Sequence, residues 1–545
     1  MKIKGDFGKS FLQYSPILVG IFIMLPRLLS PNFGFFDDAS ALAKAQEFWT
    51  GNLNPVLGAD GGRFRPLYWL YYAILYRIFG IHPLGFFIGN LLLFSILIFF
   101  TIRMALALGI NEKVAWIVGL VFALANPVIE NIYTLCKLEL LQVPLILLLL
   151  SGCELYVRIK KWYWKSIFFL LLGGIAFLVC ITKETGVLLI PASLISLIMY
   201  WLWGKFNHPL AQKGLAKRII LLWASLIGGI AFIIISSILM NHFIYSVSSG
   251  NFNFHPDWLY SQFRILVDWM LRDYLYLIPL CLGAFVALFK KSNRNYLPLL
   301  LECACWVFVW VSVYIPWMYL PEYYLLPVAL ISAIICGILV SLNIKLLRSN
   351  FLQRRIAIGS LSLSVILFAI TIPNLATNAR LQISVDSANA DMLAFIVDNA
   401  PQNSTIWINI QEPNEYVNEF VLWLNQINNR PDLKVDYFHG QDLLTAEASS
   451  QALWIVSAHL ENQFYPSVRM GVYENTSNAW NKNLENYLNG KGEQIDKIRY
   501  SMQNFNFDPM RFFCPLAGSL HYCQVPNNPF DNRIFAYGWS IERIP

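Results

Sequence analysis

Two adjacent carboxylates, Asp37 and Asp38, follow a pair of phenylalanines near the start of the chain. Apolar neighbours remove water from a carboxylate and two like charges repel each other, so both effects raise its pKa toward the range that suits a general base. A structural role competes with this interpretation, because Asp38 could cap a helix that we expect from Ala39 to Trp49. A cap accounts for one aspartate and leaves the other unexplained, so both interpretations stand.

Two arginines, Arg63 and Arg65, precede a Pro-Leu-aromatic stretch in the same region. A guanidinium group presents a planar fork of donors that suits phosphate oxygens. Contact between a surface loop and lipid headgroups would use these side chains equally well. The stretch from Pro66 to Tyr72 is predicted to be a helix among the headgroups, where Trp and Tyr are favoured.

A third group of charges lies at the ends of apolar segments. Ionisable groups at membrane depth cost free energy and usually face a cavity or a partner. Local pairing is the simpler alternative, with Lys183 bound to its neighbour Glu184. Lys137 could likewise pair with Glu139 or Glu130. The members of the group are Glu130, Lys137, Glu139, Lys183, Glu184 and Glu322.

The composition determines which elements hold these side chains. The chain has 545 residues, of which 57% are hydrophobic and 13% charged, and its mean hydropathy is +0.51. Soluble domains carry roughly 25% charged residues. The composition therefore excludes a soluble protein for most of the chain, as well as disorder, collagen and a disulfide scaffold. We expect an α-helical polytopic membrane protein.

About eleven apolar segments are long enough for a helix of some 20 residues to cross a bilayer. With a cytoplasmic N-terminus, Lys and Arg gather in every cytoplasmic segment, as the positive-inside rule predicts. This orientation places the long loop 31–83 and the C-terminus outside the cytoplasm. The predicted spans are 12–30, 84–108, 114–132, 138–157, 166–182, 185–203, 219–241, 274–289, 297–315, 323–343 and 356–374.

The charge balance reverses near residue 377. Residues 1–376 hold 29 Lys and Arg against 15 Asp and Glu, whereas residues 377–545 hold 11 against 18. The basic excess lies among apolar segments, so no nucleic-acid partner is expected. We predict a transmembrane domain over 1–376 and an extracytoplasmic soluble α/β domain over 377–545. In the second domain we expect helices over 386–399 and 415–428 and strands over 405–410 and 453–457.

Seven of the nine cysteines lie in or beside apolar segments, where Cys behaves as a small apolar residue. Cys514 and Cys523 lie in the tail that we place outside, and an oxidising compartment would let them form a disulfide. Cys303 and Cys305 lack both the CxxC spacing and a histidine partner, so no metal site is expected there.

A series of short motifs runs along residues 1–375 in a fixed order. They are Asp37-Asp38, Arg65-Pro66-Leu67, Gly80–Phe87 with Asn90, Asn126-Pro127, Lys137–Leu141, Thr182–Gly186 and Tyr319–Pro327. This order resembles the GT-C superfamily of membrane glycosyltransferases. The nearest members in pattern are the protein O-mannosyltransferases, their tetratricopeptide-bearing relatives and the lipid A aminoarabinose transferases.

The resemblance implies roles for individual residues. Asp37 would be the base and Asp38 the supporting acid, with exchangeable roles because the family often has Glu in second place. The donor phosphate would lie near Arg65, Arg63, Lys137 and Lys183. The same cavity would be lined by Glu139, Glu184, Glu322, Tyr323 and Tyr324. The family's Glu-Arg-Tyr motif stands here as Glu322-Tyr323-Tyr324, without the arginine.

The resemblance also implies the reaction, an inverting transfer of sugar from a polyprenyl-phosphate donor to an extracytoplasmic glycan, lipid or protein hydroxyl. Nucleotide sugars are absent outside the cytoplasm, so the donor must be carried in the membrane. Its phosphate is a good leaving group, so one base and several cations suffice. No metal or other cofactor is needed in the closest relatives. The expected location is the plasma (inner) membrane.

Two other functions compete with a transferase. A transporter or flippase of a lipid-linked glycan would place charges near the bilayer centre and show paired, broken helices. Most charges here lie at outer span ends, and no internal repeat is visible. A non-catalytic adhesion or assembly subunit would use the C-terminal tail as its working part.

Overall fold

The computed structural model describes most of the chain, with gaps in the loops and in the C-terminal region. The described residues are 14–35, 37–54, 64–207, 210–240, 266, 269–270, 272–314, 322–409, 413–437, 453–461, 493–503, 506–507, 530–531 and 534–544. Each segment that the sequence marks as a span coincides with a helix or with a pair of helices.

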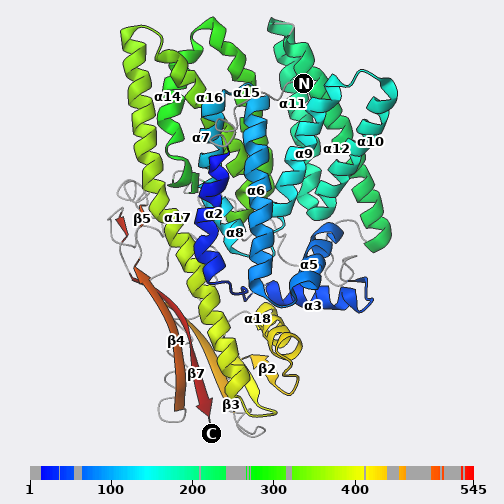
Figure 1. Ribbon diagram of the computed structural model, residues 1–545, viewed down its shortest axis with the longest axis vertical. Helices are drawn as coiled ribbons and strands as arrows, with labels where there is room; N and C mark the ends of the chain where they lie inside the picture. Colours follow the sequence, from blue (N-terminus) through cyan, green and yellow to red (C-terminus); the bar gives the residue numbers. More distant parts are fainter. Residues whose placement is uncertain are drawn as a thin grey trace, which may run out of the picture.

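The helices run along the bundle and are followed by a β-sheet at one end (Figure 1). Up to the sheet they are α2 (Ser15–Leu29), α3 (Asp38–Trp49), α5 (Pro66–Phe79), α6 (Pro83–Ala107), α7 (Glu112–Ala123), α8 (Asn126–Tyr133), α9 (Glu139–Arg158), α10 (Trp162–Thr182), η1 (Glu184–Leu188), α11 (Leu189–Asn207), α12 (Leu210–Met240), α14 (Leu277–Leu288), η3 (Lys291–Tyr296), α15 (Leu297–Tyr314), η4 (Glu322–Leu325), α16 (Leu326–Leu346) and α17 (Phe351–Asn399).

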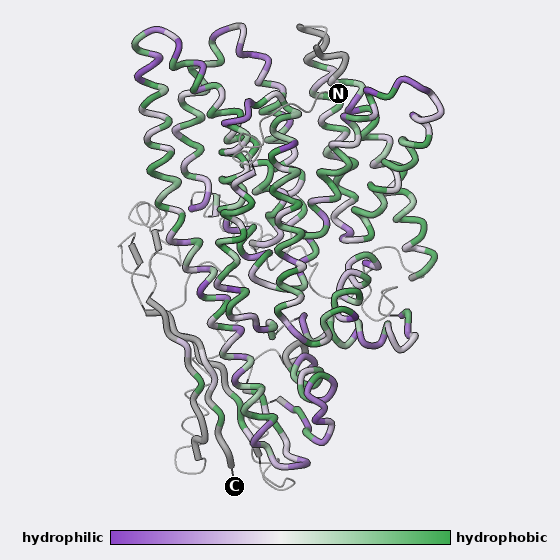
Figure 2. Tube along the Cα trace, viewed as in Figure 1, coloured by the Kyte–Doolittle hydropathy of each residue, from purple (hydrophilic) through white to green (hydrophobic). Residues whose placement is uncertain are grey.

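The bundle is that of a multi-pass membrane protein. Among the described residues, eight helices are long and apolar enough to cross a bilayer, or nine if α7 and α8 form one span bent by 56°. Two shorter apolar helices, α2 and α14, lie within the two other predicted spans and, with 15 and 12 residues, are not counted among these crossings. In Figure 2, hydrophobic residues predominate along the trace of the bundle, and hydrophilic residues are concentrated toward its two ends.

Local sequence signals explain where several helices begin. Proline occupies the first turn of α5, α6, α8 and α16, where its missing N–H would have no partner in any case. The side chain of Asn111 caps α7 by accepting from Val114 N at 3.0 Å. Asn350 caps α17 in the same way, accepting from Gln353 N at 3.0 Å.

A single helix, α17, connects the bundle to the C-terminal region. It has 49 residues, which corresponds to a length of about 74 Å, and it contains Pro373. The expected helix 386–399 is the last part of this helix. Residue 376, where the composition changes, lies inside α17, so the two predicted domains share one continuous helix.

The C-terminal region forms a mixed five-stranded sheet with strand order β2-β1-β3-β7-β4. β1 is parallel to β2 and β3, whereas β7 is antiparallel to β3 and β4. The expected strands at 405 and 453 and the expected helix at 415 are confirmed. The elements are β1 (Thr405–Asn409), α18 (Pro413–Val421), η5 (Leu422–Ile427), β2 (Lys434–Tyr437), β3 (Leu453–Glu461), β4 (Glu493–Gln503), β5 (Asn506–Phe507), β6 (Phe530–Asp531) and β7 (Ile534–Ile544).

The first loop of the chain meets this region. The helices α3 and α5 lie at the end of the bundle that faces the sheet, and α18 lies beside α3 (Figure 1). We use the name C-terminal unit for the elements from β1 to β7, including α18 and η5. The last part of α17 and the C-terminal unit therefore contact the segment that carries Asp37.

Candidate active site

The two aspartates have different surroundings. Asp37 adopts the left-handed backbone conformation, with φ of 66°, immediately before α3. Asp38 is the first residue of α3 and is only 3% exposed. Its Oδ2 accepts a hydrogen bond from the backbone N–H of Gly34 at 2.6 Å. Neither aspartate caps α3 through its side chain, so the capping interpretation of Asp38 is wrong.

The pKa of Asp38 lies far from its ordinary value. Burial of the carboxyl group, reinforced by the negative charge of Asp386, raises the pKa of Asp38 to about 7. The hydrogen bond from Gly34 and the charge of Lys137 act in the opposite direction but are outweighed. Near neutral pH, the acid pair therefore holds a proton at Asp38 for part of the time.

Lys137 lies beside the exposed member of the pair. Its Nζ is 4.0 Å from Asp37 Oδ2, and the two side chains are 1% and 61% exposed respectively. Because Asp37 reaches solvent, this ion pair is weak in itself. The arrangement nevertheless brings a buried ammonium group and an accessible carboxylate to the same place.

The backbone around Lys137 is held by motif residues from two other helices. Asn90 of α6 donates to Thr134 O at 3.0 Å, and the Tyr72 hydroxyl of α5 accepts from Cys136 N at 2.6 Å. Cys136 also has a left-handed backbone, with φ of 58°, and its Sγ lies 3.6 Å from Asp37 O. Two unusual turns thus contact each other at the site.

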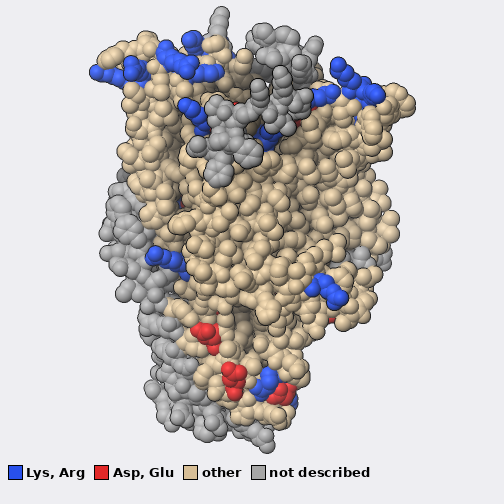
Figure 3. All heavy atoms as spheres, in the orientation of Figure 1, with Lys and Arg blue, Asp and Glu red and all other residues tan. Residues whose placement is uncertain are grey.

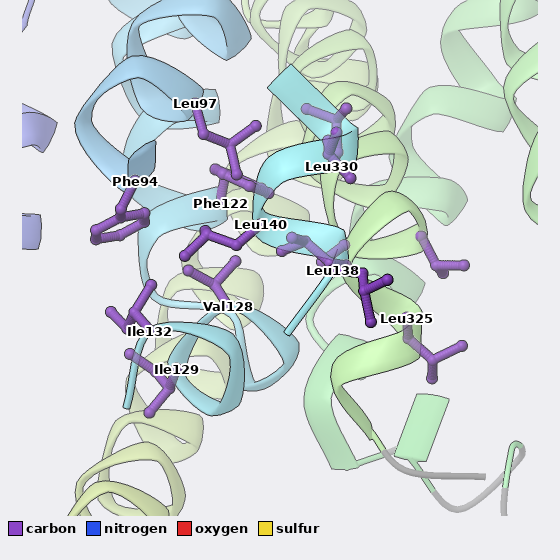
Figure 4. Packing of buried hydrophobic residues seen from close by; sticks show 14 of the residues in the cluster. Phe94, Leu97, Phe122, Val128, Ile129, Ile132, Leu138, Leu140, Leu325 and Leu330 are labelled. Carbon is purple, nitrogen blue, oxygen red and sulfur yellow. The ribbon is translucent and has the colours of Figure 1, made fainter. Parts of the chain in front are cut away.

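Buried apolar side chains pack around the turn between α8 and α9 that carries Lys137. Leu138 and Leu140, on either side of Glu139, belong to the same buried cluster as Val128 of α8 and Leu330 of α16 (Figure 4). Close packing on this scale resists rearrangement. It therefore holds the polar turn between α8 and α9 in one position.

The remaining charges pair between helices, not with their sequence neighbours. Lys183 binds Glu139, and both are almost fully buried. Arg65 binds Glu184 through two nitrogens, with Nε 2.7 Å from Oε2. The local pair of Lys183 with Glu184 and the pairing of Lys137 with Glu139 are therefore wrong, because the folded chain offers each group a partner on another helix.

A break between two helices places Lys183. α10 ends at Thr182, Lys183 is extended, and the 3-10 helix η1 begins at Glu184. Gln142 of α9 satisfies carbonyls at the break, donating to Lys183 O at 3.0 Å. Gly186 is required here, because a Cβ on it would lie 2.8 Å from backbone atoms of Cys180.

The adjacent tyrosines each face one lysine. Lys137 Nζ lies 4.1 Å from the centre of the Tyr323 ring, and Lys183 Nζ lies 3.7 Å from that of Tyr324. Asn131 of α8 fixes this segment by donating to Tyr323 O at 2.9 Å. Aromatic faces attract cations, so the two tyrosines provide part of the stabilisation that an anion would otherwise give.

Some expected site residues lie outside the described part of the chain. They are Arg63, the side chain of Glu322, and the cysteines of the predicted disulfide, Cys514 and Cys523. Glu130 lies on α8 and is half-buried. Within the described ranges, no group of three or more His, Cys, Asp and Glu residues could hold a metal ion.

A buried arginine in the first apolar helix is a further polar feature of the bundle. Arg27 lies in the apolar helix α2, is fully buried, and binds Asp386 of α17. Its guanidinium also lies 4.2 Å from the centre of the Phe87 ring. A charge within an apolar segment is expected to have a function or a partner. Arg27 could have been singled out on that ground, although its partner 359 residues away could not.

The arrangement of helices is found in solved membrane enzymes. An oligosaccharyltransferase from Archaeoglobus fulgidus, solved in the apo form, is 10% identical, with a TM-score of 0.51 over 83% of this chain and 70% of that one. This is the helix arrangement that the motif order led us to expect. The chain has the GT-C fold.

Two further structures with lower TM-scores are similar to this chain. ArnT from Cupriavidus metallidurans, bound to undecaprenyl phosphate, is 14% identical over 83% of this chain and 94% of its own, with a TM-score of 0.45. Archaeal AglB from Archaeoglobus fulgidus, in complex with an inhibitory peptide and a dolichol-phosphate, is 11% identical over 83% and 70%, with a TM-score of 0.49. No family model and no curated protein matches the chain.

Proposed function

We propose that this GT-C protein is an inverting glycosyltransferase that moves a sugar from a polyprenyl-phosphate-linked donor to an extracytoplasmic hydroxyl. One observation carries the proposal: the exposed carboxylate of Asp37 lies 4.0 Å from the buried ammonium of Lys137. A base for the acceptor and a cation for the leaving group are the two requirements of the reaction.

Asp37 is the proposed general base because it is the accessible member of the pair. Its carboxylate takes the proton of the acceptor hydroxyl while the oxygen forms a bond to the anomeric carbon. The bond from that carbon to the phosphate oxygen breaks, and the polyprenyl phosphate leaves with the electron pair. Buried Asp38 already accepts a hydrogen bond from Gly34 and acts in support.

Lys137 is the proposed contact of the donor phosphate. Its Nζ lies 4.0 Å from Asp37 Oδ2, beside the carboxylate that we propose as the base. Lys183 and Arg65, each bound to a glutamate, hold the shape of the site. Arg63 stays a predicted phosphate ligand on sequence grounds.

The orientation proposed here follows the positive-inside rule. On the face shown in Figure 3, most Lys and Arg side chains gather at the end of the bundle away from the sheet. That end would face the cytoplasm, with the Asp37 site and the C-terminal unit outside it, in the plasma (inner) membrane.

Transfer by the purified protein tests the proposal. Polyprenyl-phosphate sugars from the native membrane are offered together with envelope glycans, and Asp37→Asn is compared with wild type. We expect kcat to fall at least about 100-fold, the contribution typical of general-base catalysis. Lys137→Met should raise the donor KM, and Lys137→Arg should recover part of the loss.

The outcomes separate the competing functions. If Asp37→Asn transferred sugar with the same kcat as wild type, Asp37 would not be the general base. Movement of the lipid-linked sugar across liposomes that lack any acceptor, without transfer when acceptor is added, would favour a flippase instead. Mass spectrometry of a deletion strain should show an accumulated polyprenyl-phosphate sugar, and this would name the donor.

A further inference from the structure

The segment that carries Asp37 is attached on both sides to the C-terminal half of the chain. We use the name Asp37 segment for residues 32–40, of which Phe36 lies outside the described residues. On the N-terminal side, Asn32 donates to the Ser387 hydroxyl of α17 at 3.0 Å. Closer to Asp37, the C-terminal unit contacts the segment at Phe35 and Ser40.

Phe35, two residues before Asp37, is held by both its backbone and its ring. Its carbonyl accepts from the indole N–H of Trp423 at 3.0 Å. Its ring, only 3% exposed, packs against Phe420 with 4.8 Å between ring centres and against Trp539 with 6.3 Å. A residue fixed in this way determines where the chain enters the Asp37 turn.

Ser40, three residues after Asp37, is held by a carboxyl group of α18. Its hydroxyl donates to Glu419 Oε1 at 2.5 Å, and Glu419 is only 8% exposed. Burial and the nearby charges of Asp37 and Asp38 raise the pKa of Glu419 to about 7. Burying a carboxyl group beside two other carboxyl groups costs free energy of folding. Its position beside Ser40 therefore indicates a role other than packing.

The turn between these two anchors is the part of the segment that needs support. Asp37 has a left-handed backbone, which a residue with a side chain rarely adopts, and it contacts Cys136, which is in the same unusual conformation. Such conformations persist only where the surroundings fix them, and they concentrate at functional sites.

We propose that Trp423 and Glu419 are positioning residues, which hold the Asp37 turn from both sides so that transfer requires a docked C-terminal unit. This inference rests on the proposed function, because it assigns the two residues to the placement of its base. They act through Phe35 and Ser40 and do not touch the substrate. The C-terminal unit is thus a structural part of the active site.

The experiment removes one anchor at a time and separates kcat from the donor KM. Trp423→Phe keeps an aromatic side chain but is smaller than the indole and loses its N–H donor. Ser40→Ala removes one oxygen from a half-buried position and is therefore expected to fold. Both should lower kcat about tenfold while the donor KM and the thermal unfolding midpoint change little, because a hydrogen bond is lost outside the donor site.

A conservative variant and a matched control make the readout specific. Glu419→Gln keeps an oxygen that can accept from Ser40, so it should retain more kcat than Glu419→Ala. Tyr500→Phe serves as the control, since it removes a 2.5 Å hydrogen bond to Asp391 that joins β4 to α17 without reaching the Asp37 segment. We expect wild-type kcat for this control.

Thiol labelling reports the turn directly. Cys136 is 4% exposed and contacts Asp37. Peptide mass spectrometry should show faster maleimide labelling of Cys136 in Trp423→Phe and Ser40→Ala than in Tyr500→Phe. Wild-type kcat and unchanged labelling in Trp423→Phe, Ser40→Ala and Glu419→Ala would overturn the inference. An inactive Asp37→Asn beside these active variants would leave the proposed function intact.

Discussion

Adjacent aspartates with nearly the same sequence context have opposite environments in the folded chain. Asp37 reaches solvent beside a lysine, whereas Asp38 is buried beside Asp386 and a backbone N–H. From the sequence alone, either aspartate could be the base and the other the supporting acid. The direction of each side chain now favours Asp37 as the group that meets an acceptor, with Asp38 as a buried neighbour whose pKa lies near 7.

The raised pKa of Asp38 predicts a stability that depends on pH. The folded state keeps the proton up to about pH 7, whereas an unfolded aspartate loses it near 3.8, so the wild type loses stability as the pH rises through this window. Asp38→Asn has no proton to lose. The free energy of unfolding of Asp38→Asn, relative to that of wild type, should therefore increase between pH 4 and 7, by about 4 kcal/mol at most.

Thermal unfolding in detergent at pH 5 and pH 8 measures this effect. The unfolding midpoint of Asp38→Asn should exceed that of wild type by more at pH 8 than at pH 5. Glu419 titrates in the same range, and because the charge of Asp38 raises its pKa, Asp38→Asn also relieves part of the stability loss at Glu419, in the same direction. An equal difference at the two pH values would contradict the buried, protonated state of Asp38.

At the scale of elements, the site depends on helix ends and breaks. Lys137 lies between α8 and α9, and Lys183 lies between α10 and η1, where the backbone leaves helical geometry. Polar residues of neighbouring helices, such as Asn90 and Gln142, satisfy the carbonyls that these breaks expose. In a bilayer such groups need a partner within the protein, which explains why amides lie at these positions.

The buried pair of Lys183 and Glu139 allows stability to be separated from activity. Removing one partner leaves a buried charge and should destabilise the protein by about 3–5 kcal/mol. Lys183→Met combined with Glu139→Leu removes both charges and should recover most of this stability. Because the pair also holds the shape of the proposed site, transfer should stay reduced in the double variant.

Thermal unfolding of the two single variants and the double variant, together with the donor KM of each, forms the double-mutant cycle. The conservative exchange Ile146→Val, in the buried core about two turns beyond Glu139 in α9, is a control for packing, with an expected cost of about 1 kcal/mol. Full recovery of the donor KM in the double variant would show that the pair is structural only.

At the scale of the molecule, α17 connects the N-terminal helices with the C-terminal unit. Asp386 in this helix binds Arg27 of α2, and Trp423 in the C-terminal unit binds Phe35 of the Asp37 segment. The bundle therefore cannot be treated as a complete catalytic domain followed by an independent tail. The proposed active site combines residues of the first loop and the bundle with supporting contacts from the C-terminal unit.

The proposed orientation predicts which positions a reagent reaches from each side. Lys345 lies near the end of α16, shortly before α17 begins, and Gln402 lies just after α17 ends. Both residues are exposed, and the length of α17 separates them. In intact cells, a maleimide that does not cross membranes should label Gln402→Cys but not Lys345→Cys. Both should react once the membrane is opened.

Peptide mass spectrometry identifies the labelled cysteine, so the native cysteines can stay in place. Labelling of Lys345→Cys in sealed cells, with Gln402→Cys protected, would reverse the orientation. It would also place the Asp37 site in the cytoplasm, where nucleotide sugars are available, and would remove the reason for a lipid-linked donor.

The sequence by itself determined the helical class, the positions of the apolar segments and the Asp37, Lys137 and Lys183 motifs. Apolar length and local helix signals depend on near neighbours in the chain, so they can be read without coordinates. Only the tertiary structure decided the partners: Lys183 with Glu139, Arg65 with Glu184, and Phe35 with Trp423. Such pairs join residues 44 to 388 positions apart, and their formation depends on how the helices pack, which no local pattern contains.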